Sequence, residues 1–198
     1  MKKGFTLIEM LVAVGIIATL IAALLGGYSA MIKSAERARA TDLVKQVATA
    51  LSALYEANGG AWPLRIAKTG ETGGELDDLV AYSLVEGNTK YLALMHSGGK
   101  LIGNDRFGVL DPWGLAIMKQ RGQSATLDSV RKHLLWFAVD TDGDGIISGA
   151  KVGGEEVNVR ATAIVWCAGK DGNMEPYSKG LRRGGIYSWT VGQTKDVK

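Results

Sequence analysis

The chain has 198 residues, of which 46% are hydrophobic and 22% charged, and its formal net charge at pH 7 is +3. This near balance of charge argues against a general nucleic-acid-binding protein, which needs a strongly basic surface. Cys167 is the only cysteine, so an intramolecular disulfide is excluded. Because Cys167 lies in the apolar run 163–168, we expect an inert, buried thiol.

The N-terminus joins a short basic segment to a long apolar one. Lys2 and Lys3 precede Gly4, and the 23 residues 5–27 are almost all apolar. As a helix, this segment would be about 34 Å long, which is enough to span a bilayer core of roughly 30 Å. Basic residues on the N-terminal side predict a cytoplasmic N-terminus, with the remaining chain on the other side of the membrane.

Glu9 is a carboxylate inside the apolar segment. A charge in a membrane helix costs about 2.5–3.5 kcal/mol on insertion scales, so such a residue usually marks a function. Two simpler interpretations are a secretory signal peptide and a plain membrane anchor. The apolar segment is long for the hydrophobic region of a signal peptide, and a central glutamate is unusual there.

The next segment, residues 28–57, contains no proline or glycine and has apolar residues at helical spacing with charges between them. Asn58, Gly59 and Gly60 form a helix stop, and Pro63 follows. We therefore expect one helix over residues 5–57, about 80 Å long, which cannot fold back on itself. Its outer half can bury one face on a head domain, while its inner half packs against copies of itself.

Residues 3–10, Lys-Gly-Phe-Thr-Leu-Ile-Glu-Met, resemble the N-terminus of type IV prepilins and type II secretion pseudopilins. The resemblance implies that a prepilin peptidase cuts after Gly4 and that the new N-terminal residue, Phe5, is methylated. It also implies a role for Glu9 in assembly. The free α-amino group of Phe5 would be a cation near the membrane, and Glu9 of a neighbouring subunit would be its counter-charge.

The expected fold is α+β, a pilin lollipop whose long N-terminal helix packs on a small antiparallel β-sheet head. The expected parts are a leader (1–4), a transmembrane and filament-core helix (5–27), an amphipathic helix (28–58) and a globular head (61–198). Short helices are expected in the head at 79–84 and 91–95. Strands are expected at 115–118, 133–139, 157–167 and 186–191, with alternate residues from Val157 to Cys167 on one face.

Patches of the head resemble the major pseudopilin of type II secretion. The most specific is Asp111-Pro-Trp-Gly, and the others are residues 57–63, 91–92, 170–173 and 188–189. The resemblance implies a pseudopilus subunit of the bacterial inner membrane with a periplasmic head. Its partners would be membrane lipid, an inner-membrane assembly platform, other pseudopilins and copies of itself. The alternatives are a type IV pilin for adhesion, motility or DNA uptake, and a secreted, calcium-stabilised binding domain.

An acidic loop at residues 140–148 predicts a calcium site. Asp140, Asp142 and Asp144 occupy positions one, three and five of an EF-hand-like loop, Gly145 permits its sharp turn, and the backbone carbonyl of Ile146 is position seven. Position twelve, which should be a glutamate, is a lysine. Glu155 or Glu156 could serve as the missing ligand only if the loop bulges. An acidic turn without metal is the simpler interpretation.

The resemblance to the major pseudopilin implies calcium in a loop nearer to the C-terminus, around Asp171 and Asn173. The sequence leaves the choice between the two loops open. Catalysis is not expected, because neither His96 nor His133 has a cysteine or acidic residue at ligand spacing and no nucleophile or nucleotide-binding motif is present.

Overall fold

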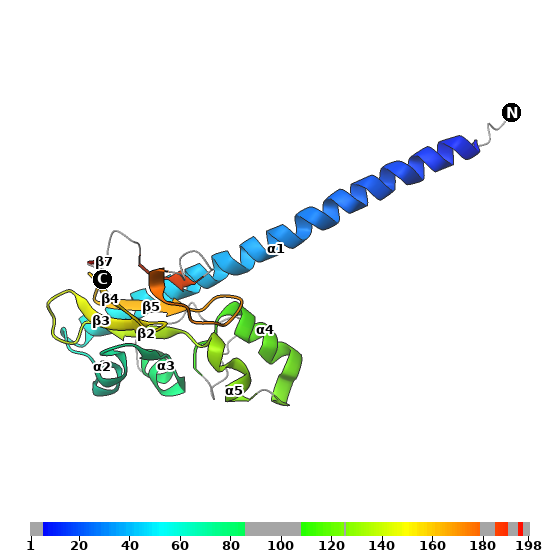
Figure 1. The fold of residues 1–198 in the computed structure, drawn as a ribbon. Coiled ribbons are helices and arrows are strands. Elements are labelled where there is room, and N and C mark those ends of the chain that lie inside the picture. The colour runs from blue at the N-terminus through cyan, green and yellow to red at the C-terminus, as the bar shows by residue number, and fades with distance from the viewer. Residues whose placement is uncertain (1–5, 86–107, 125, 179–184, 190–193, 196–198) are drawn as a thin grey trace. The chain divides into compact units, whose positions relative to one another are not determined.

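The computed structural model describes residues 6–85, 108–124, 126–178, 185–189 and 194–195 (Figure 1). The chain divides into two compact units, Met1–Ala38 and Arg39–Lys198, which we call the anchor unit and the head unit. The predicted helix at 91–95 and the Tyr91-Leu92 patch lie outside the described residues. The α+β fold, with a long N-terminal helix and a small antiparallel head, is confirmed.

The long helix α1 runs without interruption over Leu7–Ala57, including Gly26 and Gly27. It ends where the sequence predicts, at two glycines with positive φ, Gly59 at 70° and Gly60 at 82°. The amide of Gly60 donates to the carbonyl of Tyr55 at 3.0 Å, so the turn closes on the last carbonyls of the helix.

The anchor unit contains the apolar part of α1. Residues Leu7–Leu24 are long and apolar enough to cross a bilayer, and their side chains are exposed. Thr19, a polar residue in this stretch, donates its hydroxyl to the carbonyl of Ile16 at 2.8 Å. A satisfied hydroxyl costs little in an apolar environment, so Thr19 is compatible with a membrane span.

The head unit holds two antiparallel sheets instead of the single sheet expected. The first sheet has the order β1-β2-β5-β6, and the second has the order β3-β4-β7. The first sheet consists of β1 (Gly74–Glu75), β2 (Trp136–Val139), β5 (Ala163–Cys167) and β6 (Ile186–Tyr187). The second sheet consists of β3 (Ile147–Val152), β4 (Glu155–Val159) and β7 (Thr194–Lys195).

The first sheet is buried on both faces. Alternate residues of β5 join two different cores, with Val165 and Cys167 in the core that includes α1 and Ile164 and Trp166 in the core that includes the second sheet. Burial on both faces explains why β5 is continuously apolar. From α1, the first core receives Ala40, Leu43, Val44, Val47, Ala50, Leu51 and Leu54. Figure 1 shows this cyan end of α1 alongside the yellow and orange strands.

Short helices complete the head. Helix α2 (Leu64–Gly70) and helix α3 (Asp78–Val85) add Ile66 and Val80 to the first core, and α3 confirms the helix predicted at 79–84. Gly70 touches the first sheet so closely that a Cβ there would lie 2.7 Å from the Phe137 ring.

Between α3 and β2 lies a second group of helical elements with a small core of its own. Helix α4 (Pro112–Arg121) is followed by η2 (Gly122–Ser124), α5 (Leu127–Val130) and η3 (Arg131–His133). Leu110, Val130 and Leu134 are buried in this core, and Leu115 packs against them.

None of the four predicted strands has the predicted extent. Residues 115–118 belong to helix α4, because Asp111 caps that helix and Pro112 begins it. At 133–139, only Trp136–Val139 is extended, because His133 ends the 3-10 turn η3. At 186–191, the strand covers Ile186–Tyr187, a bend follows, and residues 190–191 lie outside the described residues.

The predicted single strand at 157–167 is two strands in different sheets. Residues 160–162 form a bend between β4 and β5. Val157 and Val159 therefore point into the second core, whereas Val165 and Cys167 point into the first. The alternation in the sequence predicts one strand because the bend preserves the two-residue period while the chain changes sheets.

We predict that Leu51→Ala destabilises the head by about 2–5 kcal/mol, the usual cost of removing a fully buried leucine. Leu20→Ala, in the exposed part of the same helix, is the control and should leave head stability unchanged. Urea unfolding of the full chain in detergent, followed by tryptophan fluorescence, measures both effects, since all five tryptophans lie in the head unit. Equal unfolding midpoints for the two variants would contradict this packing.

Candidate functional site

At the N-terminus of α1, Thr6 and Glu9 bind each other. The Thr6 amide and hydroxyl both donate to Glu9 Oε2, at 2.9 and 2.8 Å, and the Glu9 amide approaches Thr6 Oγ1 at 3.4 Å. A threonine with a glutamate three residues later is the capping-box pattern, in which each side chain satisfies a backbone amide of the other. The local sequence Thr-Leu-Ile-Glu therefore has two effects, because it starts the helix and it also orients the Glu9 carboxylate.

This arrangement lowers the cost of Glu9 in an apolar environment. A carboxylate that accepts two hydrogen bonds needs less solvation than an unpaired one. Among the described residues, hydrogen bonds reach only Oε2, so Oε1 is available to a cation from outside the described chain. Gly4 and Phe5, the predicted processing site, lie outside the described residues, and their roles stay predictions.

The structure brings Asp140, Asp142 and Asp144 together. One carboxylate oxygen from each lies within 4.8 Å of the others. Buried Asp140 shapes the loop, because its two oxygens accept the amides of Gly143 and Gly145 at 2.8 Å each. Asp142 and Asp144 are exposed. The arrangement offers oxygen ligands at a spacing that suits a hard cation such as calcium.

The aspartate loop is joined to the end of α1. The indole Nε1 of Trp62 donates to the backbone carbonyl of Asp140 at 2.5 Å. The Trp62 ring packs on Tyr55, with 4.8 Å between ring centroids. Trp62 and Asp140 are 78 residues apart in the chain, and this hydrogen bond joins the segment after α1 to the aspartate loop within the head unit.

The loop lacks a glutamate at position twelve. Lys151 occupies that position in β3, opposite Glu156 of β4. Glu155 accepts hydrogen bonds from the amide and hydroxyl of Ser178, at 2.9 and 3.0 Å, so it is engaged elsewhere. Within the described part of the chain, the cluster that could hold a metal contains the three aspartates alone.

The alternative loop at Asp171 and Asn173 is less suited to a cation. Both residues are exposed, and Gly172 between them has a φ of 63°. The stem of Lys132 packs on this glycine so closely that a Cβ would lie 2.8 Å from Lys132 Cδ. A lysine beside the loop places a positive charge near any cation bound there, which disfavours binding.

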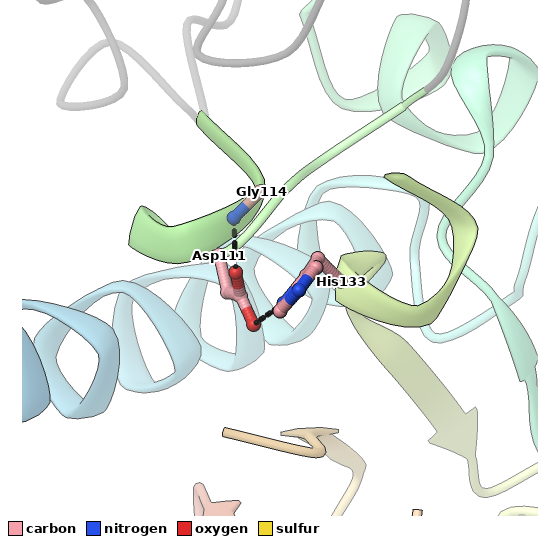
Figure 2. A network of polar contacts seen from close by, with 3 residues as sticks. All are labelled: Asp111, Gly114 and His133. Atoms are coloured by element: carbon pink, nitrogen blue, oxygen red, sulfur yellow. Dashed lines mark hydrogen bonds and ion pairs between the residues drawn. The ribbon is translucent and has the colours of Figure 1, made fainter. Parts of the chain in front are cut away.

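Sequence reasoning missed a buried polar centre, shown in Figure 2. Asp111 accepts the amide of Gly114 through Oδ1 at 2.8 Å and contacts His133 Nδ1 through Oδ2 at 3.1 Å. Asp111 is 0% exposed and His133 is 2% exposed. The Asp111 amide also donates to the His133 carbonyl at 2.9 Å. The pair therefore joins the start of α4 to the entrance of β2.

This centre explains the motif Asp111-Pro-Trp-Gly. Aspartate caps the helix, proline begins it, and Gly114 is required because a Cβ there would lie 2.7 Å from His133 Cβ. The Asp-Pro pair alone indicates the start of a helix. The sequence does not indicate that His133 contacts Asp111, because 22 residues separate the two.

Cys167 is fully buried, as expected. Burial raises the pKa of its thiol to about 12, the negative charge of Asp111 adds to the rise, and the amide of Gly169 opposes it. The thiol therefore stays protonated at neutral pH, and a protonated thiol is a poor nucleophile.

We predict that Asp111→Ala destabilises the head by roughly 2–4 kcal/mol, because α4 loses its cap and the buried imidazole loses its partner. Asp111→Asn should lose clearly less, because its amide oxygen still accepts from Gly114. Thermal unfolding of both variants measures the difference. If alanine and asparagine cost the same, the helix cap contributes nothing and the interpretation is wrong.

Residues 1–25 match the family model described as the prokaryotic N-terminal methylation motif. No curated protein and no solved structure matches the chain. The match supports a class III prepilin-type leader, which implies processing by a prepilin peptidase and assembly with other pilin-type subunits. Together with the apolar helix, this leader fits a single-pass protein anchored in the inner membrane.

Proposed function

We propose that this chain is a structural subunit of a type II secretion pseudopilus. A prepilin peptidase cuts after Gly4, Phe5 is methylated, and the apolar helix holds the subunit in the bacterial inner membrane with its head in the periplasm. An assembly platform then extracts the subunit and adds it to a helical filament of copies and other pseudopilins. The observation that carries the proposal is the methylation motif at the start of an uninterrupted 51-residue helix.

Glu9 would direct the addition of each subunit. Its Oε2 is held by Thr6 of the same chain, while Oε1 faces no donor among the described residues. The ammonium group of Phe5 on a neighbouring subunit is the complementary cation. Pairing the two charges offsets part of the cost of burying each of them in the apolar filament core.

The choice of a secretion pseudopilus over a type IV pilus is supported by the head. With Cys167 as the sole cysteine, the C-terminal region is held by packing on the two sheets instead of by a disulfide. The Asp111-Pro-Trp-Gly motif supports the same choice through its resemblance to the major pseudopilin of type II secretion. A gene neighbourhood with a secretion ATPase and an outer-membrane secretin would agree, whereas a retraction ATPase would assign the chain to a type IV pilus.

We further propose a structural role without catalysis. The polar groups most suggestive of chemistry are Asp111, His133 and Cys167, and all three side chains are buried. A substrate could not reach them without opening the core of the head. Asp111 and His133 bind each other, and Cys167 packs in the first core, so we assign all three a structural role.

The proposal includes a calcium ion on Asp140, Asp142 and Asp144, with the Ile146 carbonyl as a further ligand. The carboxylates supply negative charge, and calcium accepts additional oxygens from backbone and water. Without a bidentate glutamate, the site should fall in the weak range typical of extracellular modules, with a Kd of about 10⁻⁴–10⁻³ M. Such an ion would fasten the loop that Trp62 connects to the end of α1.

Processing and assembly test the main proposal. Mass spectrometry should find the mature chain beginning at N-methylated Phe5. Glu9→Ala and Glu9→Gln should be processed and inserted normally but should not form filaments, because both remove the counter-charge of the Phe5 ammonium. Electron microscopy of sheared filaments, with immunoblots of membrane fractions, measures each step.

The two Glu9 variants separate charge from capping. Glutamine keeps an oxygen that can accept from Thr6, so normal filaments with Glu9→Gln would show that capping, and not charge, directs assembly. A mature chain that begins near residues 23–30 would instead indicate a secretory signal peptide and would overturn the proposal.

Calcium should raise the melting temperature of the protein. A ligand at one hundred times its Kd stabilises the native state by about 2.7 kcal/mol. In a domain of this size, that corresponds to a rise of roughly 5–11 °C. Magnesium should have less effect, because it demands a tighter octahedral geometry. Thermal unfolding in about 10–100 mM calcium, which is one hundred times the expected Kd, is compared with unfolding in EDTA and measures the shift.

The exposed aspartates give the cleanest variants. Asp142→Ala and Asp144→Ala should each remove most of the calcium-dependent shift. Asp142 accepts only a long hydrogen bond from the Asp144 amide, at 3.5 Å, whereas Asp144→Ala also releases the Ile146 amide, at 2.6 Å, and Asp140→Ala releases the amides of Gly143 and Gly145. Asp142→Ala is therefore the least disruptive of the three variants. Asp171→Ala is the matched control for the other loop. If Asp171→Ala alone abolishes the shift, the C-terminal loop holds the ion, and if EDTA changes nothing, neither loop does.

A further inference from the structure

The anchor unit continues beyond the apolar span with an exposed segment. Tyr28, 65% exposed, follows the span, and Met31 and Ile32 keep the surface apolar for one more turn. Lys33 is the first charged residue after Glu9, and its side chain is exposed. An aromatic residue followed by a lysine at the end of a membrane span is the arrangement expected at a bilayer interface.

The spacing of the two charges matches the bilayer. Glu9 and Lys33 are 24 residues apart on one continuous helix, so their Cα atoms are separated by about 36 Å. The hydrocarbon core is roughly 30 Å thick, and each headgroup layer adds roughly 5–7 Å. With Glu9 at the cytoplasmic edge of the core, Lys33 falls in the headgroup layer on the other side.

The direction of the side chain strengthens this placement. Side chains on an α-helix lean toward its N-terminus, which for Lys33 is toward the membrane. The Lys33 stem can therefore lie over the preceding turn, at Ala30, while its ammonium group reaches the phosphates. Glu36, Arg37 and Arg39, the next charged residues, lie further from the span.

We propose that Tyr28 and Lys33 form an interfacial anchor, in which the Lys33 ammonium binds the phosphate of an anionic phospholipid in the outer leaflet. The anchor rests on the proposed membrane-held state of the subunit and deepens it. Lys33 opposes inward sliding of the helix, and Glu9 opposes outward sliding. The subunit is therefore stored at a fixed depth, with Glu9 at the cytoplasmic edge where new subunits can meet it.

Depth measurements on the full-length mature chain test this anchor. A nitroxide is attached at Ala23→Cys, an exposed position between the middle of the span and Tyr28. Cys167 does not interfere, because its thiol is buried and its pKa is raised to about 12. The protein is reconstituted in vesicles of phosphatidylcholine with phosphatidylglycerol, and quenching by oxygen and a nickel chelate reports the depth of the label.

Lys33→Gln should move the label deeper by about 2–5 Å, the rise of one to three residues. Lys33→Arg should keep the wild-type depth, because it retains the positive charge. Lys45→Gln removes another exposed lysine of α1, 12 residues later, and should change nothing. In vesicles of phosphatidylcholine alone, the difference between wild type and Lys33→Gln should shrink.

An unchanged depth for Lys33→Gln in anionic vesicles would overturn the anchor. An equal shift for Lys45→Gln would also overturn it, because the effect would then be one of general charge. The assay requires no filament, so it is independent of the assembly test. A label fully accessible to the nickel chelate would show that the chain is not held in the bilayer, which would contradict the proposed function itself.

Discussion

The burial of one face of α1 on the first sheet is the interaction on which the head depends. Ala40, Val44, Val47 and Leu51 are fully buried there, whereas the described side chains before Glu36 on the same helix are exposed. One continuous helix therefore has two environments, and its sequence changes accordingly from uniformly apolar to amphipathic. Helix α1 has no break between Leu7 and Ala57, so one element supplies both the long apolar segment and part of the first core of the head.

Signals that act within a few residues predicted the structure well. The glycine stop after Ala57 ended α1, and the alternating aspartates converged as their spacing required. The Thr6–Glu9 capping box is also a local signal, because a threonine followed three residues later by a glutamate is the sequence pattern of such a box. Such features depend on backbone geometry over one turn, which the order of residues largely determines.

Features that depend on distant partners could not be predicted. The Asp111–His133 pair joins residues 22 apart, and the sequence alone gives no sign of the match. The bend at 160–162 left the alternation of valines intact while moving the chain to another sheet. Strand β5 is apolar at every position because its two faces pack against two different cores. Hydrophobic periodicity alone does not indicate that a strand is buried on both faces.

Asp77, Asp111 and Asp140 share one structural role. Asp77 accepts the amide of Val80 at the start of α3, Asp111 caps α4, and Asp140 binds two glycine amides. Each satisfies backbone donors where an element begins or a loop turns. The amides of Gly143 and Gly145 hold the Asp140 carboxylate, so the chain itself fixes part of this turn. A calcium ion at the proposed site would share Asp140 with these amides and would also neutralise the exposed charges of Asp142 and Asp144.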